Sequence, residues 1–225
     1  NRNKRGIVLD LKVAAGLDLF YRLAGTADVV IQNFRPGVAE RLGIDYASLR
    51  HINPSIVYCQ ASGFGLSGPD AQRPALDPLA QARGGLMSVT GEPDSPPTRT
   101  FAGMADQVSA FLLSFGIMVA LYHRERTGEG QMVDGSLLQA QMAAQAFNIT
   151  SYLMSGTYAG SPIPRVSRKL TSPLWNHYRC KDGKWIMLGM AQVGRYWPDF
   201  RQAMFEATGE LLEPEEISVD WIRMH

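Results

Sequence analysis

Hydrophobic and polar positions follow two different periods in the first part of the chain. Short apolar runs without a helical period, as in "GIVLDL", predict β-strands over residues 7–11, 27–34 and 55–62. Between these runs, apolar residues recur at helical spacing, which predicts helices over residues 14–26, 36–44 and 45–53. Strands and helices that alternate with short links are typical of an α/β fold, in which a parallel sheet is covered by helices. Ligands of such sheets usually bind beyond the carboxyl ends of the strands, which here are residues 10–12, 32–35 and 61–64.

The middle of the chain carries its strongest helical signal. Residues 106–126 are apolar on almost all sides, which predicts a buried helix, and Gly128 is suited to end it in a left-handed conformation. The segment "QMVDGSL" predicts a further strand. The Ala- and Gln-rich residues 138–156 predict one long helix that bridges two bodies.

The pattern changes again near residue 163, where we expect a domain boundary. The segment "WNHYRCKDGKWIMLGM" predicts a hairpin with Asp182 and Gly183 in its turn, and a helix is expected over residues 196–208. These features predict a large domain at residues 1–137, a helical linker at 138–162 and a smaller α+β domain at 163–225.

The stretch "SGFGLSGP" places Gly63, Gly65 and Gly68 in a G-x-G-x-x-G pattern after a predicted strand. In a dinucleotide site the third glycine opens a helix. Here Pro69 follows directly, and Pro74 and Pro78 come soon after, so a helix cannot continue there. The glycines therefore favour a turn-rich loop over a nicotinamide site.

Composition narrows the function classes. The 225 residues have a net charge of +1 and no long basic run, so no nucleic-acid partner is expected. The two cysteines and four histidines form no metal-ligand spacing, so we expect no metal, and a reducing compartment is the default. The longest apolar run is too short to span a bilayer, and we expect a cytoplasmic protein without a membrane partner. The chain lacks an initiator Met and ends within an amphipathic pattern, so we interpret it as a fragment of a longer polypeptide.

Asp106 is the residue with the clearest chemical potential. It stands at the start of the predicted buried helix, where free backbone N–H groups and the helix dipole favour an ionised carboxylate. Such a carboxylate is either a helix cap or a nucleophile, and local sequence alone favours the cap.

Five segments change that balance when they are taken together. "NRNKRGIVLDLK", "ADVVIQNFRPGVAERLGIDY", "NPSIVYCQASGFGLSGP", "AGMADQVSA" and "LYHRERTGEGQMVDGSLL" occur in this order over residues 1–138. In order and spacing they resemble the class III (CaiB/BaiF, formyl-CoA transferase-like) CoA-transferases. The resemblance implies a Rossmann-like CoA-binding domain, a small α+β domain and an interlocked homodimer. Members of the family are longer, which agrees with a fragment.

The resemblance also assigns roles to single residues. Asp106 matches the catalytic aspartate, and Asp77 matches an acidic position beside the active site. Positions that match CoA-contacting segments are Leu9, Lys12, Asn33, Phe34, Arg35, Arg41, Arg73 and Leu76. The implied reaction needs no tightly bound cofactor, because acyl-CoA is itself a substrate and small carboxylic acids are its partners. Asp106 would attack the acyl-CoA thioester and form a mixed anhydride, from which the acceptor acid recovers the CoA.

Two alternatives stay open. Alpha-methylacyl-CoA racemases share the fold and the aspartate, but they carry a histidine where this chain has Leu76, and leucine cannot transfer a proton. The remaining alternative is a CoA-binding subunit without turnover. The sequence does not identify the donor and acceptor acids.

Overall fold

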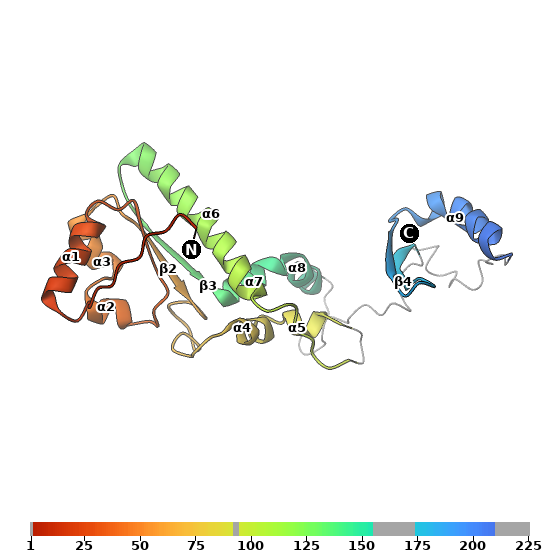
Figure 1. Ribbon diagram of the computed structural model, residues 1–225, viewed down its shortest axis with the longest axis horizontal. Helices are drawn as coiled ribbons and strands as arrows, with labels where there is room; N and C mark the ends of the chain where they lie inside the picture. The colour runs from red at the N-terminus through yellow and green to blue at the C-terminus, as the bar shows by residue number, and fades with distance from the viewer. Residues whose placement is uncertain (1, 92–94, 155–173, 210–225) are drawn as a thin grey trace. The chain divides into compact units, whose positions relative to one another are not determined.

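The computed structural model describes residues 2–91, 95–154 and 174–209 of the chain (Figure 1). By its internal contacts the chain divides into two compact units, Asn1–Thr90 with Pro97–Ile163, and Gly91–Pro96 with Pro164–His225. In the described residues, the larger unit holds a parallel sheet with helices around it, and the smaller unit holds a hairpin and a helix.

A three-stranded parallel sheet forms the centre of the larger unit. Its strands are β1 (Val29–Gln32), β2 (Val57–Ser62) and β3 (Met132–Ser136), in the order β1-β2-β3. Val29 lies opposite Val57, and Tyr58 lies opposite Met132. The α/β class predicted from the alternating pattern is therefore confirmed.

One face of the sheet packs against the helices that follow the chain's first segment. These are α1 (Ala14–Ala24) and α3 (Tyr46–Ile52), and the core that they share with the sheet includes Leu49, Ile56 and Tyr58, all fully buried. The short helix α2 (Val38–Leu42) lies between β1 and α3 in the chain. Asp45 begins α3 as the sequence predicts, because its carboxylate accepts hydrogen bonds from the N–H of Ser48 at 3.1 Å and from its hydroxyl at 2.6 Å.

The opposite face of the sheet carries α6 (Met104–Thr127), with Gly128 in the expected left-handed conformation at its end. Helix and sheet approach each other closely. A Cβ added at Gly135 would lie 2.5 Å from Leu113, and one added at Gly116 would lie 2.9 Å from Val133. A side chain at either position would force Leu113 or Val133 to shift, so the two glycines favour this close approach of helix and sheet. Two further helices, α4 (Asp77–Arg83) and α7 (Leu137–Ala144), pack against α6. The short helix α5 (Leu86–Val89) packs against α4.

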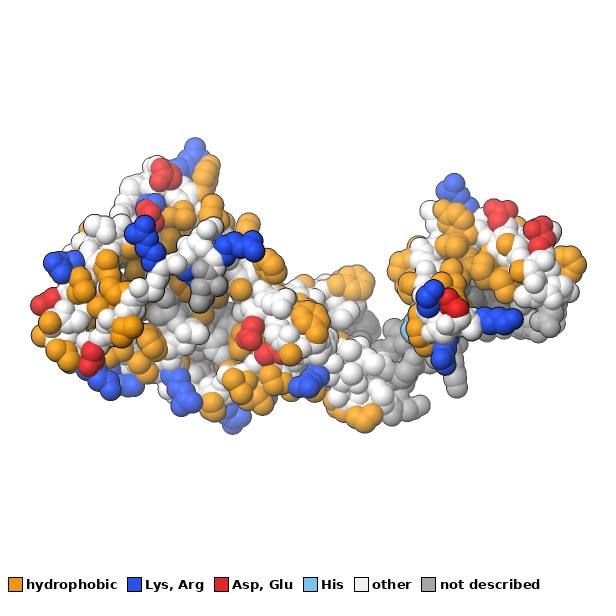
Figure 2. Space-filling model, viewed as in Figure 1, with side chains coloured by type: hydrophobic (Ala, Val, Ile, Leu, Met, Phe, Trp, Pro, Cys, Tyr) orange, Lys and Arg blue, Asp and Glu red, His pale blue; other side chains and the backbone are white. Residues whose placement is uncertain are grey.

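The expectation that α6 is buried almost all round is wrong. Phe111 is 76% exposed, Phe115 70% and Met118 63%, so one side of the helix is uncovered in the described chain. Figure 2 shows hydrophobic side chains among the charged ones on this face of the larger unit, including the part over α6. The expectation that the longest apolar run is too short to span a bilayer is wrong by length and composition, because α6 passes that test, alone among the described helices. Core helices of soluble proteins pass the same test. Here α6 lies against β2, β3, α4 and α7.

Two further expectations about local structure are wrong. Residues 7–11 are not a strand, because they pair with no strand among the described residues, and Ile7 and Val8 are 63% and 98% exposed. Residues 138–156 are not one long helix either. The helix breaks at Gln145, between α7 and α8 (Ala146–Met154), where the Gln145 side chain donates to the carbonyl of Gly84 at 2.8 Å.

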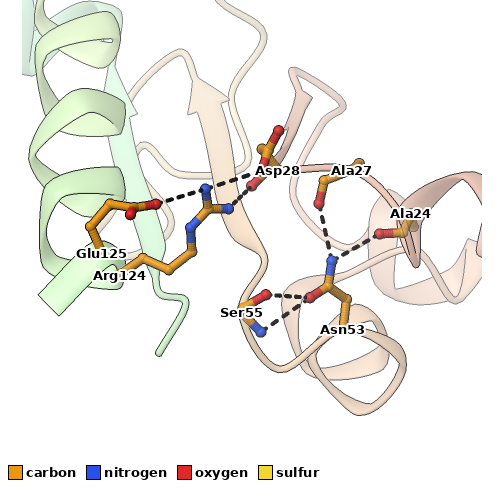
Figure 3. A network of polar contacts seen from close by, with 7 residues as sticks. All are labelled: Ala24, Ala27, Asp28, Asn53, Ser55, Arg124 and Glu125. Carbon is orange, nitrogen blue, oxygen red and sulfur yellow. Dashed lines mark hydrogen bonds and ion pairs between the residues drawn. The ribbon is translucent and has the colours of Figure 1, made fainter. Parts of the chain in front are cut away.

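A polar network joins α1, α3 and α6 at the amino ends of β1 and β2 (Figure 3). The amide of Asn53 donates to the carbonyls of Ala24 at 3.2 Å and Ala27 at 3.0 Å. Its oxygen accepts from the N–H of Ser55 at 3.1 Å and from the Ser55 hydroxyl at 2.8 Å. Every hydrogen-bonding group of this side chain is therefore satisfied within the protein.

Arg124 forms the second part of the same network. Its guanidinium lies 3.0 Å from the carboxylate of Asp28, just before β1, and 3.8 Å from that of Glu125. It also donates to the Asp28 carbonyl at 3.4 Å. The carboxyl end of α6 is in this way attached to the entry of the sheet (Figure 3).

The smaller unit contains the predicted hairpin. β4 (Trp175–Arg179) pairs antiparallel with β5 (Trp185–Gly189), and Gly183 in the turn has a φ of +83°. The helix expected nearby is α9 (Val193–Thr208). Both elements confirm the sequence pattern.

Candidate active site

A cavity of about 800 Å³ lies at the carboxyl ends of β1 and β2 in the larger unit. Its walls come from the loop after β1, the end of β2, the segment before α4, and the first half of α6. The sequence places a ligand site at these strand ends, and the structure provides a space of the size that small-molecule ligands occupy.

The loop after β1 forms one wall of the cavity. Asn33, Phe34 and Arg35 are exposed and line it. The loop is held by Gln32, which is 7% exposed and whose Oε1 accepts from the N–H of Phe34 at 2.7 Å. Arg41 does not line the cavity; its Nη1 would lie 3.3 Å from a Cβ added at Gly37, so it sits beside the end of this loop.

Of the glycine-rich segment, Gly63 lines a second wall of the cavity, and no helix follows Gly68 directly, as the sequence predicts. A Cβ added at Gly63 would lie 2.1 Å from that of Ala75. Gly63 therefore allows the end of β2 to pack against the segment before α4. Gly65 and Gly68 adopt φ values of +95° and +100°. The pattern makes a close loop contact at the cavity and does not open a helix onto a phosphate.

Asp106 lies on the cavity wall, at the third helical position of α6. The local interpretation as a helix cap is wrong, because Gly103 is the capping residue and the Asp106 side chain makes no capping bond. Its carboxylate is exposed and has no hydrogen bond or ion pair with the described residues. It is thus a charged group that faces the cavity with nothing in the described protein to neutralise it.

Asp77 supplies the cap that Asp106 does not. One carboxylate oxygen, Oδ1, accepts from the N–H of Ala105 at 2.6 Å and from that of Asp106 at 3.3 Å, and Oδ2 accepts from Gln81 at 2.8 Å. Burial by itself would raise the pKa of Asp77, which is 9% exposed. The bonds from Gln81 and from the N–H groups of Ala105, Asp106 and Gly103 outweigh burial and lower this pKa. Asp77 therefore stays ionised, with both oxygens occupied.

This arrangement bears on where an oxyanion can be stabilised. The N–H groups of Ala105 and Asp106 at the start of α6 are already engaged by Asp77. They are not free to bind a second negative charge. The start of α6 therefore has two fewer N–H donors for an oxyanion. In the loop after β2, Gly63 lines the cavity, whereas the N–H of Gly65 donates to the Ser62 hydroxyl at 3.0 Å.

The structure brings together most of the residues that the sequence singled out. Those that line the cavity are Asn33, Phe34, Arg35, Arg73, Leu76, Asp77 and Asp106. Leu9, Lys12 and Arg41 lie outside its lining. Arg73 is exposed and pairs with Asp70 at 3.1 Å.

Sequence reasoning missed several cavity residues. Gln32 holds the loop after β1, and Cys59 lies on β2 in the cavity lining. Ser109, which is buried, and Ser114, which is exposed, line the cavity from α6. Burial, with a smaller contribution from Asp134, raises the pKa of the Cys59 thiol, so this thiol is protonated at neutral pH. None of these residues carried a sequence signal beyond its place at a strand end or on the predicted helix.

The cavity belongs to a chain with clear relatives. A family model described as CoA-transferase family III matches residues 1–217. A succinate–glutarate CoA-transferase of Agrobacterium fabrum is 44% identical over 156 residues, which are 69% of this chain and 39% of that protein. A succinyl-CoA–D-citramalate CoA-transferase of Chloroflexus aurantiacus is 34% identical over 206 residues, 90% of this chain and 50% of that protein.

A solved structure is similar as well. The crystal structure of a CaiB/BaiF family protein from Brucella suis matches with a TM-score of 0.75 and 35% identity, over 88% of this chain and 52% of that one. The resemblance found in the sequence motifs is confirmed in both sequence and fold. The chain spans between 39% and 52% of the length of these relatives.

Proposed function

Because this chain belongs to CoA-transferase family III, we propose that the full-length protein moves CoA from an acyl-CoA donor to a free carboxylic acid through an anhydride on Asp106. The observation that supports this most directly is the carboxylate of Asp106 on the cavity wall, which has no partner in the part of the chain that the structure describes. An unneutralised carboxylate in a cavity does little for folding and is suited to act as a nucleophile.

The reaction can be written with the groups of this cavity. A carboxylate oxygen of Asp106 attacks the thioester carbon, the C–S bond breaks, and CoA leaves as a thiolate. The acceptor carboxylate then attacks the aspartyl carbon of the anhydride and releases the donor acid. The thiolate attacks the acceptor's acyl carbon, which yields the new thioester and restores the Asp106 carboxylate. A thiolate held nearby makes this last step effectively intramolecular.

Other residues of the cavity would bind CoA. Asn33, Phe34 and Arg35 present an amide, a ring and a guanidinium on the loop after β1, and Arg41 adds a second cation beside that loop. Cations and amides of this kind suit the phosphates of CoA. Leu76, which is 68% exposed at the cavity, provides apolar surface for the pantetheine arm.

The cavity favours transfer over racemisation. A racemase needs two groups that exchange protons with opposite faces of the α-carbon. No histidine is among the described residues that line this cavity, and the racemase histidine position is Leu76. The second carboxylate, Asp77, is occupied by hydrogen bonds from the protein.

The proposal is tested with the full-length protein, succinyl-CoA and a panel of free acids labelled with ¹⁸O in the carboxylate. We expect the acceptor acid to enter the CoA pool, and one ¹⁸O atom to appear on Asp106 after a single turnover, by mass spectrometry of its peptide. Label in the CoA pool with none on Asp106 would remove the anhydride from the mechanism. Exchange of the α-proton with solvent, without transfer, would instead establish a racemase.

The quaternary structure is also a proposal. The family resemblance implies an interlocked homodimer, and light scattering of the full-length protein measures whether its mass is that of two chains.

A further inference from the structure

Gln81 is a fully buried residue of α4 that is bonded at both ends of its side-chain amide. Its Nε2 donates to Oδ2 of Asp77 at 2.8 Å and to the carbonyl of Phe101 at 3.4 Å. Its Oε1 accepts from the N–H of Thr100 at 3.0 Å and from the Thr100 hydroxyl at 3.1 Å. The side chain therefore fastens α4 to the segment that leads into α6.

The contacts continue from Gln81 to the cavity through Asp77. Gln81 holds one oxygen of Asp77, and the other oxygen holds the N–H groups of Ala105 and Asp106. The backbone of Asp106 is thus attached, through one carboxylate, to an amide on another helix. Gln81 itself does not line the cavity, so it cannot touch a substrate bound there.

We propose that Gln81 is a positioning residue for the Asp106 carboxylate and acts through Asp77. The inference rests on the proposed function, since it assigns a role within the same reaction. A nucleophile must be held within a fraction of an ångström of its target, and a displacement of about 1 Å can cost about 100-fold in rate. A link that joins α4, the 98–101 segment and the first turn of α6 meets this need.

Replacing the amide by a carboxyl group separates positioning from general stability. In Gln81→Glu the new oxygen faces the Asp77 carboxylate in place of an N–H donor, so an ionised Glu repels Asp77 and a protonated Glu donates to it again. The other charged groups on elements packed against Gln81 are Arg83 on α4, Arg99 in the preceding segment and Asp106 in the first turn of α6, while α5 and α7 carry none. The remaining charged or titratable groups of α6 are at its far end, namely Tyr122, His123, Arg124, Glu125 and Arg126.

The experiment compares full-length wild type with Gln81→Met, Gln81→Glu and the control Gln141→Met, by kcat, CoA Kd and melting temperature from pH 5.5 to pH 8. Gln141 on α7 is also fully buried, but its side-chain amide has no partner among the described residues. We expect Gln81→Met to lower kcat about 10- to 100-fold at every pH, with CoA Kd within about twofold. We expect Gln141→Met to stay within about twofold of wild type in both.

The decisive readout is the pH dependence of Gln81→Glu. We expect its kcat, relative to wild type, to rise about tenfold or more from pH 8 to pH 5.5, because two facing carboxylates share a proton as the pH falls. A constant ratio across this range, or Gln81→Met with wild-type kcat, would overturn the positioning role. If Gln81→Met does not fold, the isosteric Gln81→Glu decides alone. Failure of the wild type to transfer CoA would count against the proposed function and would be seen before any variant is compared.

Discussion

Polar side chains at the two ends of the parallel sheet have different partners. At the amino ends of β1 and β2, Asn53 and Arg124 form hydrogen bonds and ion pairs with other groups of the protein (Figure 3). At the carboxyl ends, Asp106 and the loop around Arg35 present charges to a cavity. Polar groups that are satisfied within the protein maintain a fold, and charges left unpaired toward a cavity are available to a ligand.

Asp77 combines the properties of both ends of the sheet. It lines the cavity, yet both of its oxygens are bonded to the protein, as those of a structural residue would be. The comparison therefore predicts that changes at the amino ends reduce stability, that a change at Asp106 reduces activity, and that a change at Asp77 does both.

The largest effect is expected for Asp106→Asn. Loss of the nucleophile should reduce kcat of the full-length protein by at least about 10³-fold, as seen when covalent catalysts lose their nucleophile. Because its side chain has no partner among the described residues, the melting temperature should change by less than about 2 °C. The matched control is Asp18→Asn on the exposed side of α1, which should leave both unchanged. Wild-type turnover in Asp106→Asn would contradict the proposed chemistry.

The next effect belongs to the amino end. Asn53→Ala removes four hydrogen bonds and leaves the carbonyls of Ala24 and Ala27 without that donor, so we expect a loss of about 2–3 kcal/mol in the free energy of unfolding. Urea denaturation measures it, and kcat at 25 °C should stay within about twofold. Asn53→Asp keeps the acceptor for Ser55 and loses the donor to Ala24 and Ala27. Its loss in the free energy of unfolding should therefore lie between zero and that of Asn53→Ala.

Asp77→Asn tests the residue that combines the properties of both ends. Because the folded pKa of Asp77 is lowered, its ionised form is favoured in the folded state, and this contributes stability above the unfolded value of about 3.8. That contribution is lost as the pH falls through the lower folded pKa. We expect Asp77→Asn to cost about 1–2 kcal/mol at pH 7 and progressively less toward pH 3. A cost that does not change between pH 7 and pH 3 would show that the charge of Asp77 plays no part.

The smallest effect is expected for Arg124→Met. The Asp28 carboxylate that it contacts is 78% exposed, so solvent and salt screen the pair, and we expect a loss of about 0.5 kcal/mol or less. In 1 M NaCl the difference from wild type should shrink further, since the screening length falls to about 3 Å. A loss above about 2 kcal/mol that is insensitive to salt would instead show that packing of the Arg124 side chain dominates.

The elements that the sequence predicted well are those set by neighbours in the chain. Asp45 caps α3 through Ser48, three residues on, and Gly128 ends α6 through its own backbone. The predictions that failed depend on distant partners. Residues 7–11 have an apolar pattern but no described strand beside them, and the Gln145 side chain at the helix break donates to the carbonyl of Gly84, 61 residues away.

The candidate site follows the same division. The position of Asp106 and the loop after β1 could be predicted, because motifs and strand ends locate them. The cap from Asp77 could not, since the bond joins residues 28 positions apart. Gln81 carried no sequence signal, and hydropathy could not show which side of α6 is covered.

The close contact of α6 with the sheet has a consequence for how new acids could be accommodated. Gly116 and Gly135 bring the helix that carries Asp106 close to the sheet, since a side chain at either position would displace Val133 or Leu113. We therefore expect changes of substrate, whether in natural divergence or in laboratory selection, to arise in the surrounding loops before they arise in the placement of α6. A mutant library aimed at new acids should vary residues 33–36 and 71–76 and leave both glycines untouched.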